Sequence, residues 1–115
     1  MTIEARYLFV VTMDVAPERE ALFHEVYDTE HVPHLLAVPG VRAVTRAEAE
    51  PFALALGGRV EPRPAASPRY LAIYEIDGPD VLASDAWTTA VERGRWPSEV
   101  RPFTTNRGHA LYRVR

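Results

Sequence analysis

The first apolar segment, RYLFVVTMDV at residues 6–15, limits the possible folds of this chain more than any other feature. Its β-branched and aromatic residues predict a strand. Side chains alternate between the two faces of a strand. One face carries Tyr7, Phe9, Val11 and Met13, and the other carries Leu8, Val10 and Thr12. Because both faces are largely apolar, we expect this strand to be covered on both sides.

The remaining segments alternate between strand and helix patterns. Further strands are predicted at 41–48, 69–77 and 108–115, and helices at 17–38 and 80–94. The resulting order, β-α-β-β-α-β, is that of the split βαβ or ferredoxin-like arrangement, an α+β fold in one domain spanning residues 1–115. Its antiparallel sheet has helices on one face only. Since the predicted strands are apolar on both faces, we expect a second copy of the chain to cover the other face.

Pro33 lies deep inside the first predicted helix, where proline removes a backbone hydrogen bond and clashes with the preceding turn. Asp28 and Thr29 are favourable N-cap residues, so a helix that restarts at either one leaves Pro33 in a tolerant first turn. Pro39-Gly40 ends the segment. We therefore predict one long, kinked helix.

Residues 50–68 contain four of the ten prolines together with Gly57-Gly58. We interpret this segment as a long loop with a helical turn at 52–56. Loops of this length in compact domains are usually functional or mobile.

Composition excludes several classes of chemistry. The chain has no cysteine, which removes thiolate nucleophiles and Fe–S ligation. All thirteen basic residues are arginine, so no lysine is present for a Schiff base or for anchoring pyridoxal phosphate. A net charge of −3 with scattered arginines gives little support to nucleic-acid binding.

The expected localisation rests on the lack of a membrane-length apolar run and of a signal-peptide pattern. No apolar run approaches the roughly 20 residues of a membrane helix. The N-terminal MTIEARYLFVV lacks a basic region followed by a small-residue cleavage site. We therefore expect a cytoplasmic protein with no membrane partner.

The helical stretch YDTEHVPH, residues 27–34, carries the candidate catalytic residues. Tyr27 and His31 are one helical turn apart, so their side chains can face one cavity. A histidine with its ordinary pKa near 6.5 exchanges protons at neutral pH, which predicts a limb in the pH–activity profile there. A tyrosine hydroxyl can stabilise a developing enolate. The alternative interpretation is a half-buried histidine that is bonded to a backbone carbonyl at the kink.

Several other side chains are candidates for contact with a ligand, and others are excluded from the site. The candidate ligand-binding residues are Tyr74 as a second pocket hydroxyl, Trp96 as a cap, and the histidines His34 and His109. Arg69 and Arg101 can hold a carboxylate-bearing ligand. His24, beside Glu20, Glu25 and Asp28, is interpreted as part of a solvated face. A metal site built from His31, His34 and a carboxylate lacks a fourth ligand, so no metal is predicted.

The chain resembles the EthD-like branch of the dimeric α/β-barrel superfamily. The resemblance rests on Tyr27, His31, Pro33 and Leu35 in YDTEHVPHL, followed by AVPGVRAVTRAE, PRYLAIYEIDGPDVLASDAW and the late VRPF and HALYRV. It implies a ferredoxin-like protomer that forms a homodimeric barrel, with a pocket between the sheet and the helices of each subunit. Some relatives are cofactor-free cyclases, monooxygenases or isomerases, and others are haem enzymes or have no known activity.

From the residues and the resemblance together, we expect a small cofactor-independent enzyme acting on an aromatic or carbonyl-bearing molecule. In this hypothesis His31 is the general base and Tyr27 the hydrogen-bond donor. The alternative is a non-catalytic ligand-binding or accessory protein with the same pocket.

Overall fold

The structure is a computed structural model that describes residues 3–115. Four strands form the main sheet: β1 (Tyr7–Val15), β2 (Val41–Glu48), β5 (Tyr70–Ile76) and β6 (Thr104–Arg113). Their order across the sheet is β2-β5-β1-β6, and each neighbouring pair is antiparallel. This strand order confirms the ferredoxin-like α+β fold that the sequence predicts.

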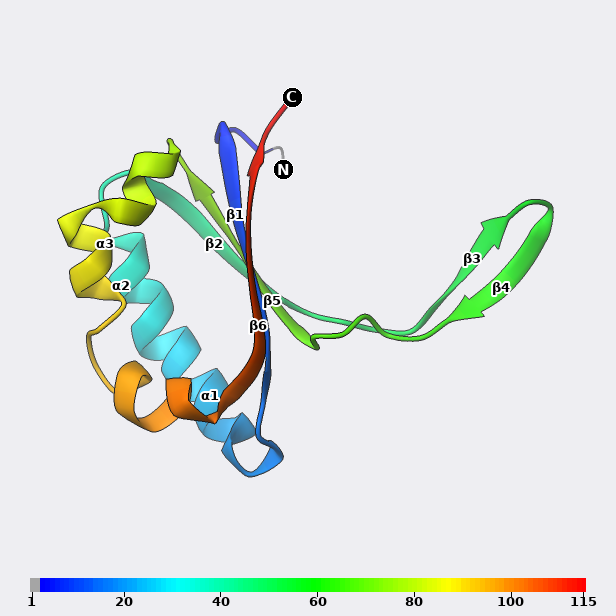
Figure 1. Ribbon diagram of the computed structural model, residues 1–115, viewed down its shortest axis with the longest axis horizontal. Coiled ribbons are helices and arrows are strands. Elements are labelled where there is room, and N and C mark those ends of the chain that lie inside the picture. The colour runs from blue at the N-terminus through cyan, green and yellow to red at the C-terminus, as the bar shows by residue number, and fades with distance from the viewer. Residues whose placement is uncertain (1–2) are drawn as a thin grey trace.

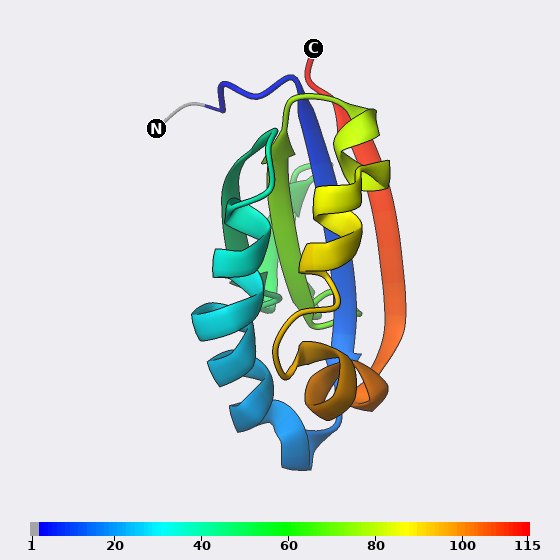
Figure 2. The same cartoon turned by 90° about the vertical axis from the view of Figure 1, so that its left-hand side faces the viewer.

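The helices lie together on one face of this sheet (Figures 1 and 2). The first helical segment contains α1 (Glu20–Val26) and α2 (Val32–Leu36), and the second contains α3 (Asp85–Ala90). Short 3-10 helices at Pro17–Arg19, Pro79–Ala83 and Arg101–Phe103 and a π-helical turn at Trp96–Val100 complete the layer. The core lies between the layers and is formed mainly by Phe23, Val26, Leu35, Tyr74, Ile76 and Val100.

The opposite face of the main sheet is not covered by any helix of the described chain (Figure 1). Side chains on this open face are mostly apolar and half-buried, and the central ones are Leu8, Val10, Leu71, Ile73 and Ala110. The alternation expected for β1 is confirmed, since Val11 and Met13 are buried under the helices while Val10 and Thr12 are on the open face. We call this surface the open sheet face.

The first helix is long and interrupted, but the interruption differs from the prediction. A π-helical turn, Tyr27–His31, joins α1 to α2 without any side-chain N-cap at Asp28 or Thr29. Pro33 follows in the first turn of α2. A proline clashes with the carbonyl four residues earlier in a regular helix, and the wider π turn gives room at that position. The chain therefore keeps one continuous helical path.

The segment at 50–68 is not a loop with a helical turn, so that prediction is wrong. Strands β3 (Phe52–Leu56) and β4 (Arg59–Arg63) form a separate antiparallel hairpin, which we call the arm. Gly57 and Gly58 connect its strands, and both have positive φ angles, 63° and 79°. A two-residue connection of this kind matches the twist of the flanking strands. The arm extends away from the helices, beyond the open sheet face (Figure 1).

Candidate functional site

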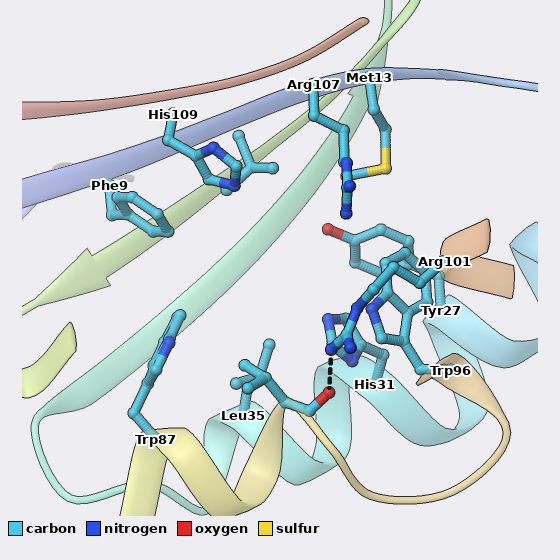
Figure 3. Close-up of a pocket in the computed structure, with 12 residues that line it drawn as sticks. Phe9, Met13, Tyr27, His31, Leu35, Trp87, Trp96, Arg101, Arg107 and His109 are labelled. Atoms are coloured by element: carbon cyan, nitrogen blue, oxygen red, sulfur yellow. Dashed lines mark hydrogen bonds between the residues drawn. The ribbon is translucent and has the colours of Figure 1, made fainter. Parts of the chain in front are cut away.

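A cavity of about 210 Å³ lies between the helices and the strands β1 and β6 (Figure 3). Aromatic and aliphatic side chains form most of its wall: Phe9, Val11, Met13, Leu35, Trp87, Val91 and Trp96. The polar groups in the lining are Tyr27, His31, Arg101, Arg107 and His109. An apolar cavity of about 150 Å³ is enough to hold benzene, so this one fits a substituted aromatic ring.

His31 is the central polar group of the cavity. The π-helical turn presents its ring toward the sheet, and only 5% of the residue is exposed. Trp96 stacks on it with ring centroids 4.1 Å apart and planes 15° apart. The buried Nδ1 atom has no hydrogen-bond partner among the described residues. His31 is therefore not the backbone-bonded histidine of the alternative interpretation.

Burial, together with the smaller effects of the positive charges of Arg101 and His34, lowers the pKa of His31 to about 3. The sequence-based expectation of an ordinary pKa is therefore wrong. The physical reason is that the imidazolium form loses its hydration in an apolar site and faces another cation. The ring is neutral throughout the neutral pH range.

Tyr27 lies beside His31, with ring centroids 5.2 Å apart and planes nearly perpendicular. Its hydroxyl shares a hydrogen bond of 3.0 Å with the hydroxyl of Tyr74, which comes from the central strand β5. Burial raises the pKa of both phenols. Tyr74 is not part of the cavity wall, so it supports Tyr27 from behind.

Glu30 and Arg95 fix the loop that carries Trp96. The backbone N–H of Arg95 donates to Glu30 Oε1 at 2.9 Å, and Arg95 Nε donates to Glu30 Oε2 at 2.6 Å. Arg95 also contacts Glu25 at 3.0 Å. The two hydrogen bonds from Arg95 hold the pKa of Glu30 below its usual value. The loop is thereby tied to the helix that carries His31, which places Trp96 over the imidazole.

The cavity contains cations and no carboxylate. Arg101 and Arg107 both line it, from the two sides seen in Figure 3. Arg101 donates to the Val91 carbonyl at 2.7 Å and forms an ion pair with Glu92, at 3.0 Å, which is not part of the cavity lining. His109 stacks on Phe9 at the β6 side of the cavity. This charge pattern favours a guest that carries, or develops, negative charge.

The structure brings together most of the predicted site residues, and a few lie elsewhere. Tyr27, His31, Trp96 and His109 line the same cavity, whereas Tyr74, predicted as a second pocket hydroxyl, lies behind Tyr27 and outside the lining. His34 lines a second cavity together with Asp85 and Arg93, and its Nδ1 atom also lacks a partner among the described residues. His34 is thus removed from the site that was predicted for it.

Two further expectations are corrected by the contacts. His24 is half-buried and accepts a hydrogen bond of 2.9 Å from Arg46, so it is not simply solvated. Arg69 pairs with Glu48 at 2.9 Å on the surface, which leaves it outside the cavity. Of the two arginines proposed for a carboxylate ligand, only Arg101 lies in the cavity wall.

Arg107 is the site residue that sequence reasoning missed. It stands two positions before His109 in β6 and lines the same cavity. The predicted strand began at residue 108, so the rule that residues two apart on a strand share a face was not applied to Arg107. Phe9 and Trp87, which pack against the core, also form part of the cavity wall.

Residues 3–115 contain no cluster of metal-ligating side chains and no membrane-length apolar helix. No group of three or more His, Asp or Glu side chains in this range is placed to hold a metal ion. Across the same residues, no helix has the length and apolar character to cross a bilayer.

The fold and the cavity together define a ferredoxin-like α+β domain with a pocket between its sheet and its helices. An EthD (ethyl tert-butyl ether D) family protein from Bacillus halodurans, known from a crystal structure, superposes on this chain with a TM-score of 0.57. The match covers 95% of this chain and 99% of that one at 12% sequence identity. The sequence itself matches no family model and no curated protein. The likeness supports the EthD-like fold expected from the sequence.

Proposed function

We propose that this chain is a small cofactor-independent enzyme that transfers a proton within an aromatic, carbonyl-bearing molecule bound in the cavity. The observation that carries the proposal is His31, a neutral, buried imidazole with an unpartnered nitrogen in a wall of aromatic side chains. Buried polar groups normally have a partner, and a missing one at a pocket points to a role in binding or catalysis.

The proposed step is an enolisation. The imidazole of His31 takes a proton from the carbon next to the carbonyl, and the C–H electron pair moves into the enolate. The negative charge on the enolate oxygen is stabilised by Arg101 and Arg107, the cations that line the cavity. His31 then returns the proton to the same or another carbon, so no oxidant or metal is consumed.

A low pKa makes His31 a weak base, so the proposed step relies on the arginines to stabilise the enolate and on the enolate to stabilise the imidazolium. With a pKa of about 3 the ring is unprotonated in the empty cavity, so it is available as an acceptor at neutral pH. The imidazolium is stabilised only while the enolate beside it balances its charge. The acidic limb of the pH–activity profile is therefore expected well below neutrality.

The experiment follows exchange of carbon-bound protons with D2O by NMR, with phenylpyruvate as an anionic probe and phenylacetone as its neutral counterpart. We expect the protein to accelerate exchange, His31→Gln to abolish the acceleration, and Arg107→Gln to affect phenylpyruvate more than phenylacetone. Absence of acceleration with both probes, while phenylpyruvate quenches the fluorescence of Trp96 and Trp87, would favour a carrier over an enzyme.

A non-catalytic ligand-binding protein is the second candidate. It is favoured by the Tyr27 hydroxyl, which already bonds to Tyr74 and is less free to act on a guest. In this case phenylpyruvate binds equally well to the wild type and to His31→Gln, and neither protein accelerates exchange.

We also propose that the functional unit is a homodimer in which two open sheet faces pack on each other. The support is the row of apolar side chains that no helix of residues 3–115 covers. Contiguous apolar surface of this kind usually marks an interaction site.

A further inference from the structure

The arm, residues 52–63, is the feature that neither the cavity nor the sheet explains. Its two strands contact each other extensively and no other helix or strand to a comparable extent. An isolated two-stranded hairpin is at best marginally stable in water. The arm therefore needs a surface to pack against.

The two faces of the arm differ in character. Pairing of β3 with β4 places an apolar row next to a charged row on one face: Phe52, Leu54 and Leu56 beside Arg63, Glu61 and Arg59. The other face carries Ala53, Ala55, Val60 and Pro62. All three side chains of the apolar row are exposed, and Leu56 reaches 61%. Val60 on the other face is exposed too, at 72%, but the first face presents three larger apolar side chains beside a charged edge, which is the apolar-centre and polar-rim pattern of protein contacts.

The surface area of the chain measures how much contact is missing. A compact monomer of 12.9 kDa exposes about 6,300 Å² by the usual scaling with mass. This chain exposes 7434 Å², a surplus of about 1,100 Å². Its radius of gyration, 15.8 Å, likewise exceeds the roughly 13 Å of a compact domain of this length. A standard interface buries about 800 Å² on each partner, so the surplus is enough for a stable dimer.

The direction of the arm identifies the partner. It leaves the main sheet between β2 and β5 and extends past the open sheet face, on the side opposite the helices (Figure 1). A second copy seated on the open sheet face would occupy the space alongside the arm. We propose that each arm packs its apolar row, Phe52, Leu54 and Leu56, against the flank of a second copy of this chain, so that two arms embrace the dimer. This inference rests on the dimer proposed above.

A two-fold dimer makes the contact reciprocal, because each surface patch meets its counterpart on the other subunit. Pro62 has no backbone N–H and blunts the outer edge of β4 against pairing with further chains. The arm is thus expected to bind through side chains rather than by adding strands. Closed pairs, and not open-ended filaments, are the expected product.

The first experiment uses the absence of cysteine from the chain. A single Arg59→Cys substitution at the arm tip is labelled with a benzophenone maleimide and irradiated, with ¹⁵N-labelled and unlabelled chains mixed. We expect mass spectrometry to find cross-links between chains of different isotope content. Cross-links confined to one chain, in a sample that sediments as a dimer, would overturn the inference and leave the sheet-paired dimer standing.

The second experiment measures the dimer dissociation constant by sedimentation equilibrium. The double substitution Leu54→Ser/Leu56→Ser should raise this constant at least ten-fold, while Val60→Ser, an exposed residue on the other face of the arm, should change it less than two-fold. Equal constants for all three proteins would refute the arm contact. A monomeric wild type would refute both the arm contact and the dimer, and the proton-exchange assay would remain a separate test of the cavity. Binding of that monomer to phosphatidylcholine vesicles through Leu54 and Leu56 would instead assign the arm to a lipid surface.

Discussion

At the scale of single residues, His31 connects the stability of the fold with the chemistry of the cavity. Its pKa of about 3 in the folded chain lies far below the ordinary value of 6.5. The buried Nδ1 atom has no hydrogen-bond partner among the described residues, and this lowers the free energy of unfolding. The effect of the lowered pKa on stability can be measured through its dependence on pH.

We predict that His31→Gln removes part of the acid sensitivity of folding. Because the folded pKa is lowered, the unfolded chain binds more protons between pH 6.5 and about 3, so stability falls as pH decreases through this window. Above pH 6.5 this histidine contributes no pH dependence. Urea unfolding at one protein concentration should show the wild type losing about 2–3 kcal/mol more than the variant between pH 7 and pH 4.5. Parallel curves for the two proteins would contradict the lowered pKa.

We predict that the hydroxyls of Tyr27 and Tyr74 are energetically coupled. Each single change, Tyr27→Phe or Tyr74→Phe, leaves one buried hydroxyl without its 3.0 Å partner and should cost about 1–2 kcal/mol. The double variant removes both hydroxyls, so its free energy of unfolding should fall by less than the sum of the two. Urea unfolding of the four proteins measures the coupling, and strictly additive losses would show that the bond is not formed in solution.

At the scale of elements, the turn before Trp96 links the second helical segment to the first. Gly94 has a φ angle of 68°, and a Cβ atom there would collide with Glu30 Oε1. The turn and the Glu30–Arg95 bonds therefore act together to place Trp96 on His31. A change in this turn should reach the cavity although no residue of the turn lines it.

We predict that Gly94→Ala destabilises the protein by about 2 kcal/mol, from left-handed backbone strain together with the displaced Glu30 carboxylate. In a Glu30→Ala background the same substitution should cost only the backbone part, about 1 kcal/mol. Thermal or urea unfolding of the four combinations measures the difference. An equal cost in both backgrounds would mean that the carboxylate is not held against the turn.

The same elements show what the sequence could and could not predict. Strand β1 was predictable because its alternation survives from Tyr7 to Met13, and the long helix because Leu22, Phe23, Val26 and Tyr27 keep one apolar face. The π-helical turn before Pro33 was not predictable. A helix that restarts at an N-cap residue and a widened π-helical turn both relieve the clash at this proline, and the sequence does not distinguish them. The arm was missed because its prolines suggested a loop, although Gly-Gly between two alternating runs is a hairpin signal.

In the candidate site, the residues related by local spacing were predictable and those that depend on tertiary structure were not. Tyr27 and His31 could be found because a helical turn of spacing fixes their common direction. Arg107 could not be predicted as a site residue, because the predicted strand began at residue 108 and β6 begins at Thr104. The low pKa of His31 could not be predicted, because it depends on burial beside Trp96. Trp96 lies in a segment for which the sequence predicts no regular element.

At the scale of the whole molecule, the chain has two unequal faces. The helical layer buries one face of the main sheet and encloses the cavity, while the open sheet face presents apolar side chains with no cover from residues 3–115. Val10 of β1 lies directly opposite Ile73 of β5 at the centre of that face. Burial of such a patch between two copies would exclude water from both sheets at once.

The final prediction concerns this central position. Ile73→Glu places a charge in the middle of the proposed dimer interface, where it would lose its hydration without a partner. We expect the wild type to sediment as a dimer and Ile73→Glu as a folded monomer, because the side chain is only half-buried in a single subunit. Leu36→Glu, the same kind of change at an exposed apolar position on the helical layer, serves as the control and should remain dimeric. A dimer that tolerates the charge at residue 73 would have to use another surface, and the apolar open face would then need a different explanation.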